Sequence, residues 1–410
     1  MSKMRRLGAL ALALVMTLTA LAGCGGGDGS ASSSSSAGAS SADTSAGAEP
    51  MDLSQITDPY LTTSGLAADT VVATAGDMDI TAAELLYWIN YGTALYLSQF
   101  GGFLTEVPWD TDLGGTTMAE QMKQSSLEAA AFYALLPVVG REEGLSPADG
   151  LEETLDQQLA EMADQLGSEQ LATYAMWYDL LTPELLLKLN QRADLHMQLQ
   201  ELYYGEGSEG YPTDAEVLAY AQDELGCFRV KHILLSTMDL TTREALDEGT
   251  AAEKKALADD LLAQLRAAED PVALFDELMN EHSEDTGLAA NPDGYVFTAS
   301  DSLVGGFREA ALELADGEIS EVVETDYGYH ILLRLPLDPA DYRDEMVAQR
   351  MQVRSDQWIE DYGLTPTEEF DRIDVAAFYD NMVAMQTAIY AALQEATSQD
   401  DGSGASSSAG

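Results

Sequence analysis

An apolar run with a period of two reads Cys227-Phe228-Arg229-Val230-Lys231-His232-Ile233-Leu234-Leu235. Phe228, Val230, His232 and Leu234 alternate with their neighbours, so they are expected on one face of a β-strand. A lone histidine on a strand is more often a core residue with satisfied hydrogen bonds than a functional group. His232 therefore counts as a candidate site residue only if other segments support it.

The segments that follow this strand predict a small domain over residues 226–336. Helices are expected at 251–267, from Asp270-Pro271 to about Glu281, and at about 306–314. Short strands are expected at Tyr295-Val296-Phe297, near 319–324 and at 329–335. The predicted order is β-α-α-β-α-β-β.

Helical patterns lie on both sides of the small domain. Val71-Val72-Ala73-Thr74-Ala75 predicts a strand, and Thr81 with Glu84 forms a capping box that begins a helix. The chain is mostly helical over 70–225 and again over 337–395. The simplest architecture joins these two stretches into one helical domain, with the small domain inserted, and the fold class is α+β.

The N-terminal residues follow the sequence of features found in a bacterial lipoprotein signal. Three basic residues precede an apolar stretch from Leu7 to about Leu21, and Leu21-Ala22-Gly23-Cys24 matches the lipobox. We expect a signal peptide at 1–23 and acylation of Cys24, whose two acyl chains give stable anchoring in a lipid bilayer. The predicted location is the extracytoplasmic face of the cell membrane.

The chain after Cys24 is polar. Residues 25–49 are almost all Gly, Ser, Ala, Asp and Thr. Such a composition cannot bury enough apolar surface to form a core. We therefore predict a disordered tether at 24–69 and a disordered tail at 396–410.

Composition excludes some functions. There are 19 Lys and Arg residues against 71 Asp and Glu, a formal net charge of −52, so nucleic acid is a poor partner. Cys227 lies in the apolar run and is interpreted as a buried core thiol. No Cys/His cluster has the spacing of metal ligands, and we expect no metal and no cofactor.

Four strings, in this order, resemble the parvulin-type peptidyl-prolyl cis–trans isomerases. They are Phe228–Leu235, His282-Ser283-Glu284-Asp285, Asp316-Gly317-Glu318-Ile319-Ser320 and Thr325-Asp326-Tyr327-Gly328-Tyr329-His330-Ile331-Leu332. A lipobox, a polar tether and a helical domain split around one parvulin domain resemble the PrsA-type foldase lipoproteins. That resemblance implies unfolded or partly folded exported proteins as partners, and the outer face of a single-membrane envelope. Whether the chain forms a homodimer stays open.

The resemblance also assigns site residues by position. His232 and His330 become the paired central histidines, and Asp285 takes the position that the family fills with Cys or Asp. These three are the candidate catalytic residues. Leu303 falls where the family usually has Met, and Phe307 where it has Phe, so both are expected to line the proline-binding surface.

Two segments depart from the family. Asn291-Pro292-Asp293-Gly294 stands where a Gly-Gly-Asp-Leu-Gly run is common, and 298–302 is about one residue longer. These departures put the shape of the proline site in question more than the fold.

The chemistry needs neither a nucleophile nor a metal. An X–Pro bond rotates over a barrier of roughly 20 kcal/mol that comes from lost amide resonance. A dry surface disfavours the charge-separated planar amide and fits the twisted amide better. A non-catalytic holdase with a degenerate parvulin domain is the alternative. A solute-binding lipoprotein is not favoured, because it needs parallel sheets that the helical run 81–225 does not offer.

The remaining histidines, His196 and His282, are interpreted as structural. Aromatic residues are frequent in the helical part, where they form either a core or an apolar cradle for unfolded clients. They are Tyr87, Trp88, Tyr91, Tyr96, Phe100, Phe103, Trp109, Phe132, Tyr133, Tyr174, Trp177 and Tyr178.

Overall fold

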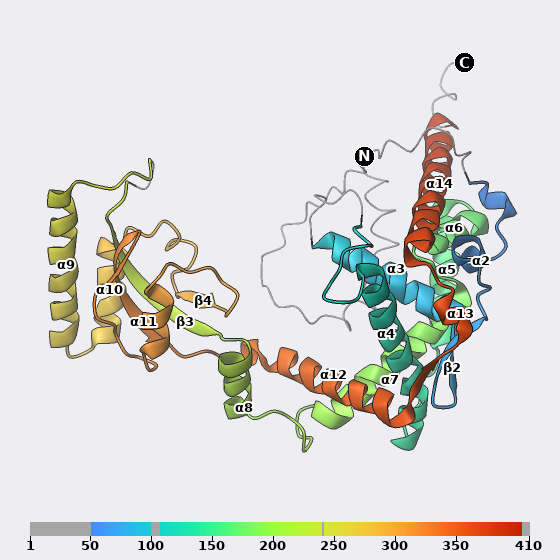
Figure 1. Ribbon diagram of the computed structural model, residues 1–410, viewed down its shortest axis with the longest axis horizontal. Coiled ribbons are helices and arrows are strands. Elements are labelled where there is room, and N and C mark those ends of the chain that lie inside the picture. Colours follow the sequence, from blue (N-terminus) through green and yellow to red (C-terminus); the bar gives the residue numbers. More distant parts are fainter. Residues whose placement is uncertain (1–50, 100–106, 240–241, 404–410) are drawn as a thin grey trace, which may run out of the picture. The chain divides into compact units, whose positions relative to one another are not determined.

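The computed structural model describes residues 51–99, 107–239 and 242–403, with side chains described as far as 396 (Figure 1). The predicted signal peptide, Cys24 and the tether up to residue 50 lie outside the described residues, as do Phe100 and Phe103. Among the helices of the described part, none combines the length and the apolar character needed to cross a membrane.

The chain divides into two units. The first unit joins the chain up to Tyr211 with the chain from Ala348 onward, and the inserted unit is Pro212–Val347. The α+β fold class with an inserted small domain is therefore confirmed. The inserted unit extends beyond the expected 226–336 at both ends.

The first unit is mostly helical. Its N-terminal part contains η1 (Leu53–Gln55), α2 (Pro59–Ser64), β1 (Val71–Ala75), β2 (Met78–Thr81), α3 (Ala82–Ser98), α4 (Met118–Glu142), α5 (Leu151–Leu166), α6 (Glu169–Tyr178) and α7 (Pro183–Tyr204). Helix α12 (Arg343–Tyr362) returns the chain to this unit, and β7 (Leu364–Pro366), α13 (Glu368–Asp371) and α14 (Val375–Ser403) complete it. Helix α14 continues past residue 396, where we expected the ordered chain to end.

A three-stranded antiparallel sheet joins the two parts of the first unit. Its order is β2-β1-β7, so a strand that follows the insertion pairs with one that precedes it. Thr367 strengthens the pairing, because its N–H donates to the Val72 carbonyl at 2.9 Å. The predicted capping box is present: the Thr81 hydroxyl accepts from the N–H of Glu84, and the Glu84 carboxylate accepts from the N–H of Thr81.

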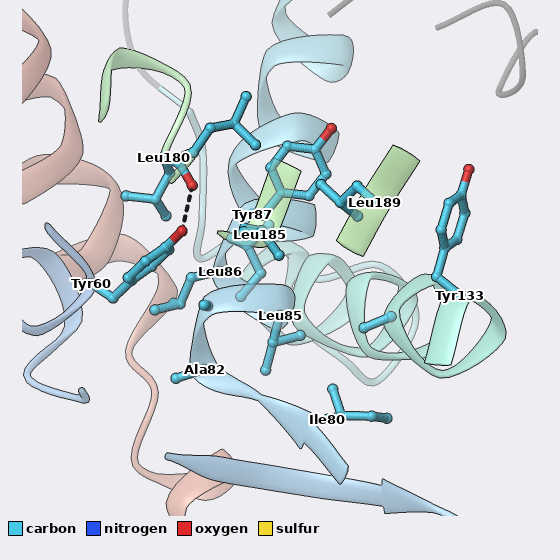
Figure 2. Packing of buried hydrophobic residues seen from close by; sticks show 14 of the residues in the cluster. Tyr60, Ile80, Ala82, Leu85, Leu86, Tyr87, Tyr133, Leu180, Leu185 and Leu189 are labelled. Carbon is cyan, nitrogen blue, oxygen red and sulfur yellow. Dashed lines mark hydrogen bonds between the residues drawn. The ribbon is translucent and has the colours of Figure 1, made fainter. Parts of the chain in front are cut away.

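Apolar side chains from both parts share one core. Figure 2 shows Leu85 and Leu86 of α3, Leu185 and Leu189 of α7 and Ile80 of β2, which belong to one cluster of buried side chains. The far end of the chain contributes buried residues of α14 to the same cluster. They are Phe378, Met382, Met385 and Ile389.

The tether prediction is wrong for residues 51–69. Helix α2 begins at Asp58-Pro59, where the Asp58 carboxylate accepts from two backbone N–H groups. Tyr60 is fully buried, and its hydroxyl donates to the Leu180 carbonyl at 2.9 Å (Figure 2). This segment is ordered because an aromatic side chain from it completes a distant core.

The described aromatic residues of the helical part lie mainly in that core. Tyr87, Trp109, Tyr133 and Tyr174 are buried, and Trp88, Tyr96, Phe132 and Trp177 are partly buried against the cluster. Tyr178 is exposed at its surface. Burial of most of these rings favours the core interpretation over a cradle for clients.

The inserted unit has the predicted order of elements. It contains α8 (Asp214–Ala219), a π-helical turn η2 (Tyr220–Glu224), β3 (Phe228–Ser236), α9 (Glu248–Ala267), α10 (Pro271–His282), β4 (Tyr295–Phe297), α11 (Phe307–Glu313), β5 (Val323–Thr325), β6 (Gly328–Leu335) and η3 (Pro339–Asp341). The strands form an antiparallel sheet in the order β4-β3-β6-β5.

Alternation along β3 and β6 gives the sheet two buried faces. Ile233, Leu235, Ile331 and Leu333 pack against α9 and α10. The opposite face carries Phe228, Val230 and Leu332, which pack against Phe307 and Ala311 of α11. Because side chains on a strand alternate, His232 and His330 belong to this second face.

The segments flanking the sheet form a small cluster of their own. Val217, Tyr220, Cys227, Leu337 and Tyr342 are buried together. Burial raises the pKa of the Cys227 thiol, and its side chain interacts with Tyr342. The interpretation of Cys227 as a buried core thiol is confirmed.

Candidate functional site

The two central histidines come from neighbouring strands. In the β3–β6 ladder His232 is opposite Leu332, and Leu234 is opposite His330. His232 and His330 are therefore diagonal neighbours on one face. Their ring centroids lie 5.3 Å apart, with the rings inclined at 65°.

Asp285 reaches this face from the loop after α10. The loop is fixed to β3 by main-chain and side-chain hydrogen bonds. Glu284 N–H donates to the Leu234 carbonyl at 2.8 Å, and the Ser283 hydroxyl accepts from Leu234 N–H at 3.1 Å. The Glu284 carboxylate accepts from Ser236 N–H at 2.7 Å. This docking brings the His-Ser-Glu-Asp string beside the first strand.

The Asp285 carboxylate lies next to His232. Its Oδ2 is 3.1 Å from Nε2 of His232 and accepts from the Tyr295 hydroxyl at 2.5 Å. Its Oδ1 accepts from Gly287 N–H at 3.0 Å. Interaction with His232 lowers the pKa of Asp285 most, and the bonds from Tyr295 and Gly287 add to it, so the carboxyl stays ionised well below its usual range.

His330 differs from His232 in its surroundings. It is buried, with 3% of its surface exposed, and its Nε2 lies 2.9 Å from the Thr325 hydroxyl. Burial lowers the pKa of His330 to about 3, and a charge on the His232 ring would lower it in the same direction. Its imidazole is therefore neutral at neutral pH.

Apolar side chains complete the site. Phe307, at the start of α11, presents its ring to both histidines with centroid distances of 5.3 Å. Leu303 and Phe297 are partly buried against the same cluster. The rings of Phe297 and Phe307 meet edge to face at 5.9 Å.

The two segments that depart from the family are ordered here. Gly294 has φ +98°, and a Cβ at this position would lie only 2.8 Å from the Val230 carbonyl oxygen. The turn can approach β3 this closely because glycine has no side chain. The turn Thr298–Asp301 is held by the Arg308 guanidinium, which donates to the carbonyls of Thr298 and Asp301.

The structure brings all five predicted site residues to one face of the sheet: His232, Asp285, Leu303, Phe307 and His330. Two side chains that the sequence interpretation missed, Tyr295 and Thr325, make hydrogen bonds within the group. The spacing of Tyr295 and Phe297 predicts that both lie on one face of a strand. It does not predict which group the Tyr295 hydroxyl contacts.

The other two histidines lie elsewhere. His196 is buried in the first unit, where its ring meets Phe132 edge to face at 5.2 Å. His282 ends α10, and its nearest acidic partner is Glu281 at 3.9 Å.

Comparisons with known proteins find a family match within the inserted unit. The family model for the PPIC-type PPIase, or rotamase, domain matches residues 232–335. The chain is 35% identical over 120 residues to the foldase protein PrsA of Geobacillus kaustophilus. This match covers 29% of this chain and 35% of that protein. It is 24% identical over 248 residues to the foldase protein PrsA of Staphylococcus aureus strain Newman. This match covers 58% of this chain and 71% of that protein.

Among solved structures, the peptidyl-prolyl isomerase PrsA of Bacillus cereus is similar at 22% identity with a TM-score of 0.26, over 60% of this chain and 83% of that one. The family model covers the whole site, since His232, Asp285, Leu303, Phe307 and His330 all lie within the matched residues. Residues 232–335 therefore match the PPIC-type, or parvulin-type, rotamase family, and more than half of the chain is similar to the foldase protein PrsA.

Proposed function

We propose that the inserted unit catalyses cis–trans isomerisation of X–Pro bonds in exported proteins. The observation that carries this proposal is the position of the His232 ring, which contacts Asp285, His330 and Phe307 on one face of the sheet. His232, Asp285 and His330 are the proposed catalytic residues, and Leu303 and Phe307 the proposed proline-binding surface.

The proposed chemistry is stabilisation of a twisted amide. The ring of a bound proline would pack on Leu303 and Phe307, away from water. An apolar setting disfavours the charge separation of the planar amide, so the twisted form gains relative stability. No bond breaks in this rotation, and the chain's groups act by excluding water and by fixing the shape of the surface.

The protonation states of the site support this mechanism. A neutral His330 keeps a charge away from the apolar surface, where it would stabilise the planar, polar amide. The negative charge of Asp285 is engaged by donors on both oxygens.

The proposal extends to the location of the protein. The lipobox at Leu21–Cys24 supports anchoring through acylated Cys24 on the extracytoplasmic face of the membrane. Cys24→Ala is expected to be exported but released from membranes. A Cys24→Ala variant that remains membrane-bound after a salt wash would contradict the anchor.

The test of catalysis uses a coupled prolyl-peptide assay on the full-length protein. Phe307→Ala removes the ring that faces both histidines, and we expect at least a tenfold loss of activity. His330→Ala is expected to lower activity as well. Leu312→Ala is the matched control, because Leu312 lies on the same helix and is 54% exposed. Circular dichroism establishes first that each variant folds.

The alternative, a holdase without isomerase activity, predicts different results. If the folded variants isomerise prolyl peptides at the parent rate, or if the parent shows no rate above buffer, catalysis is rejected. Suppression of client aggregation, measured on the same proteins, would then identify the holdase.

A further inference from the structure

We propose that Tyr295 is a positioning residue of the isomerase site, which holds the Asp285 carboxylate against His232 with the support of Asn291 and Gly287. This inference rests on the proposed function. It assigns a role to the segment in which the sequence departs from other parvulins.

The first observation is the hydrogen bond itself. The Tyr295 hydroxyl donates to Oδ2 of Asp285 at 2.5 Å, and this is the oxygen that faces Nε2 of His232 at 3.1 Å. Oδ1 is held separately by the N–H of Gly287. Because each oxygen has its own donor, the carboxylate cannot rotate without losing one of them.

The second observation is that Tyr295 is itself fixed. Its ring stacks on Phe297 with a centroid distance of 5.8 Å and an interplanar angle of 12°. The centroid of its ring also lies 5.5 Å from the centroid of the His232 ring. Strand β4 pairs with β3 here, with Tyr295 opposite Val230. The Tyr295 hydroxyl is therefore positioned by a paired strand rather than by a loop.

Asn291 gives the hydroxyl a second partner. Its side-chain amide donates to the Gly287 carbonyl at 3.1 Å. The Asn291 amide also interacts with the Tyr295 hydroxyl. Burial and Asp285 raise the pKa of Tyr295, and the interaction with Asn291 slightly offsets this rise. The pKa of Tyr295 is about 12, so the hydroxyl carries its proton and donates at neutral pH. The residue that begins the unusual segment thus supports the site.

Gly287 leaves room for this arrangement. A Cβ built at position 287 would lie 2.4 Å from the Tyr295 hydroxyl oxygen, closer than any real contact of this kind. A side chain there must displace the hydroxyl. Gly287→Ala and Tyr295→Phe therefore disturb the same bond by different means, the first by moving the hydroxyl and the second by removing it.

The experiment is a double-mutant cycle on the full-length protein. We expect Tyr295→Phe and Gly287→Ala each to lower kcat for a prolyl peptide about three- to tenfold, with KM changed less than twofold. The double variant should be no worse than the poorer single variant, because the two changes remove one interaction. Tyr329→Phe is the control, since Tyr329 packs on the opposite face of the sheet.

A spectroscopic readout separates positioning from loss of structure. The imidazole ¹⁵N resonances of His232 should shift in Tyr295→Phe and Gly287→Ala and stay at their parent values in Tyr329→Phe. A folded Tyr295→Phe protein with parent kcat and parent His232 resonances would overturn this inference and leave the proposed function standing. A parent protein without isomerase activity would reject the proposed function, while the ¹⁵N resonances would still report whether Tyr295 positions Asp285.

Discussion

The imidazoles of His232 and His330 meet at an inclined angle, with centroids 5.3 Å apart, on strands that lie side by side. Their surroundings make them chemically different. His232 faces the ionised Asp285, whereas His330 is buried beside the Thr325 hydroxyl. A pair that looks symmetric in the sequence therefore occupies two different environments.

The stability of the inserted unit should fall on mild acidification because of His330. Its folded pKa is about 3, below the unfolded value of about 6.5, so below pH 6.5 the unfolded chain binds a proton that the folded chain does not. The free energy of unfolding should decrease by up to about 1.4 kcal/mol per pH unit from this group. Asp285 contributes only below its unfolded pKa of about 3.9.

The measurement compares the parent with His330→Gln at pH 7, 6 and 5. Urea unfolding is followed through amide resonances of β3 and β6. We expect a smaller loss of stability with falling pH in His330→Gln, whatever its absolute stability. Equal slopes for the two proteins would show that His330 is not a buried neutral imidazole.

Gly328→Ala should destabilise the inserted unit strongly. Gly328 has φ +138°, and a Cβ there would lie 2.3 Å from the Leu235 carbonyl oxygen and 2.8 Å from Thr237 N. Both contacts are with backbone atoms, so no side chain can move aside. The expected cost is on the order of 3 kcal/mol, and separation of β3 from β6 would be seen by amide exchange.

The matched control for this prediction is Gly317→Ala. Gly317 also has positive φ, +81°, but nothing lies within 4 Å of a Cβ at that position. It should cost only about 1 kcal/mol, from backbone strain alone. Equal losses in the two variants would attribute the effect of Gly328→Ala to strain rather than to the close approach of β3.

Glu84→Gln should destabilise the first unit by about 3–5 kcal/mol. Glu84 is 1% exposed, caps α3 and forms an ion pair with the buried Arg192. Removing its charge leaves the guanidinium buried without a counter-charge. Fluorescence of the four tryptophans, which all belong to the first unit, reports its unfolding in denaturant.

Glu120→Gln is the control, because Glu120 closes the equivalent capping box of α4 in an exposed position. Glu120→Gln should lower the free energy of unfolding much less than Glu84→Gln does, because the exposed side chain stays solvated. A similar small loss in both variants would mean that the pair of Glu84 with Arg192 adds little to stability.

Phosphorylated substrates should not be preferred. The segment from Ser236 to Gly249, which runs from the end of β3 to the start of α9, contains an exposed Arg243 among acidic residues. These are Asp239, Glu244, Asp247 and Glu248. A phosphate would meet net negative charge. Assays with phosphoSer-Pro, Ser-Pro and Ala-Pro peptides should give similar rates, and a tenfold preference for the first would contradict this expectation.

Local patterns in the sequence were sufficient for the elements of the inserted unit. The period-two run at β3, the Asp270-Pro271 helix start and the Gly328-Tyr329-His330 string depend on neighbours in the chain, because backbone geometry and capping act over a few residues. The capping box of Thr81 and Glu84 was readable for the same reason. His232, Asp285 and His330 lie in strings of this kind. Leu303 and Phe307 were assigned by position through the family that the strings resemble.

Only the tertiary structure decided how distant segments complete one another. Helix α2 is ordered because the Tyr60 hydroxyl donates to the Leu180 carbonyl. The two parts of the first unit are joined because β7 pairs with β1, which precedes the insertion. The Tyr295 hydroxyl finds Asp285 for the same kind of reason. A side chain's partner across the fold is set by packing and strand register, which sum contributions from the whole chain. No local pattern of residues contains that information.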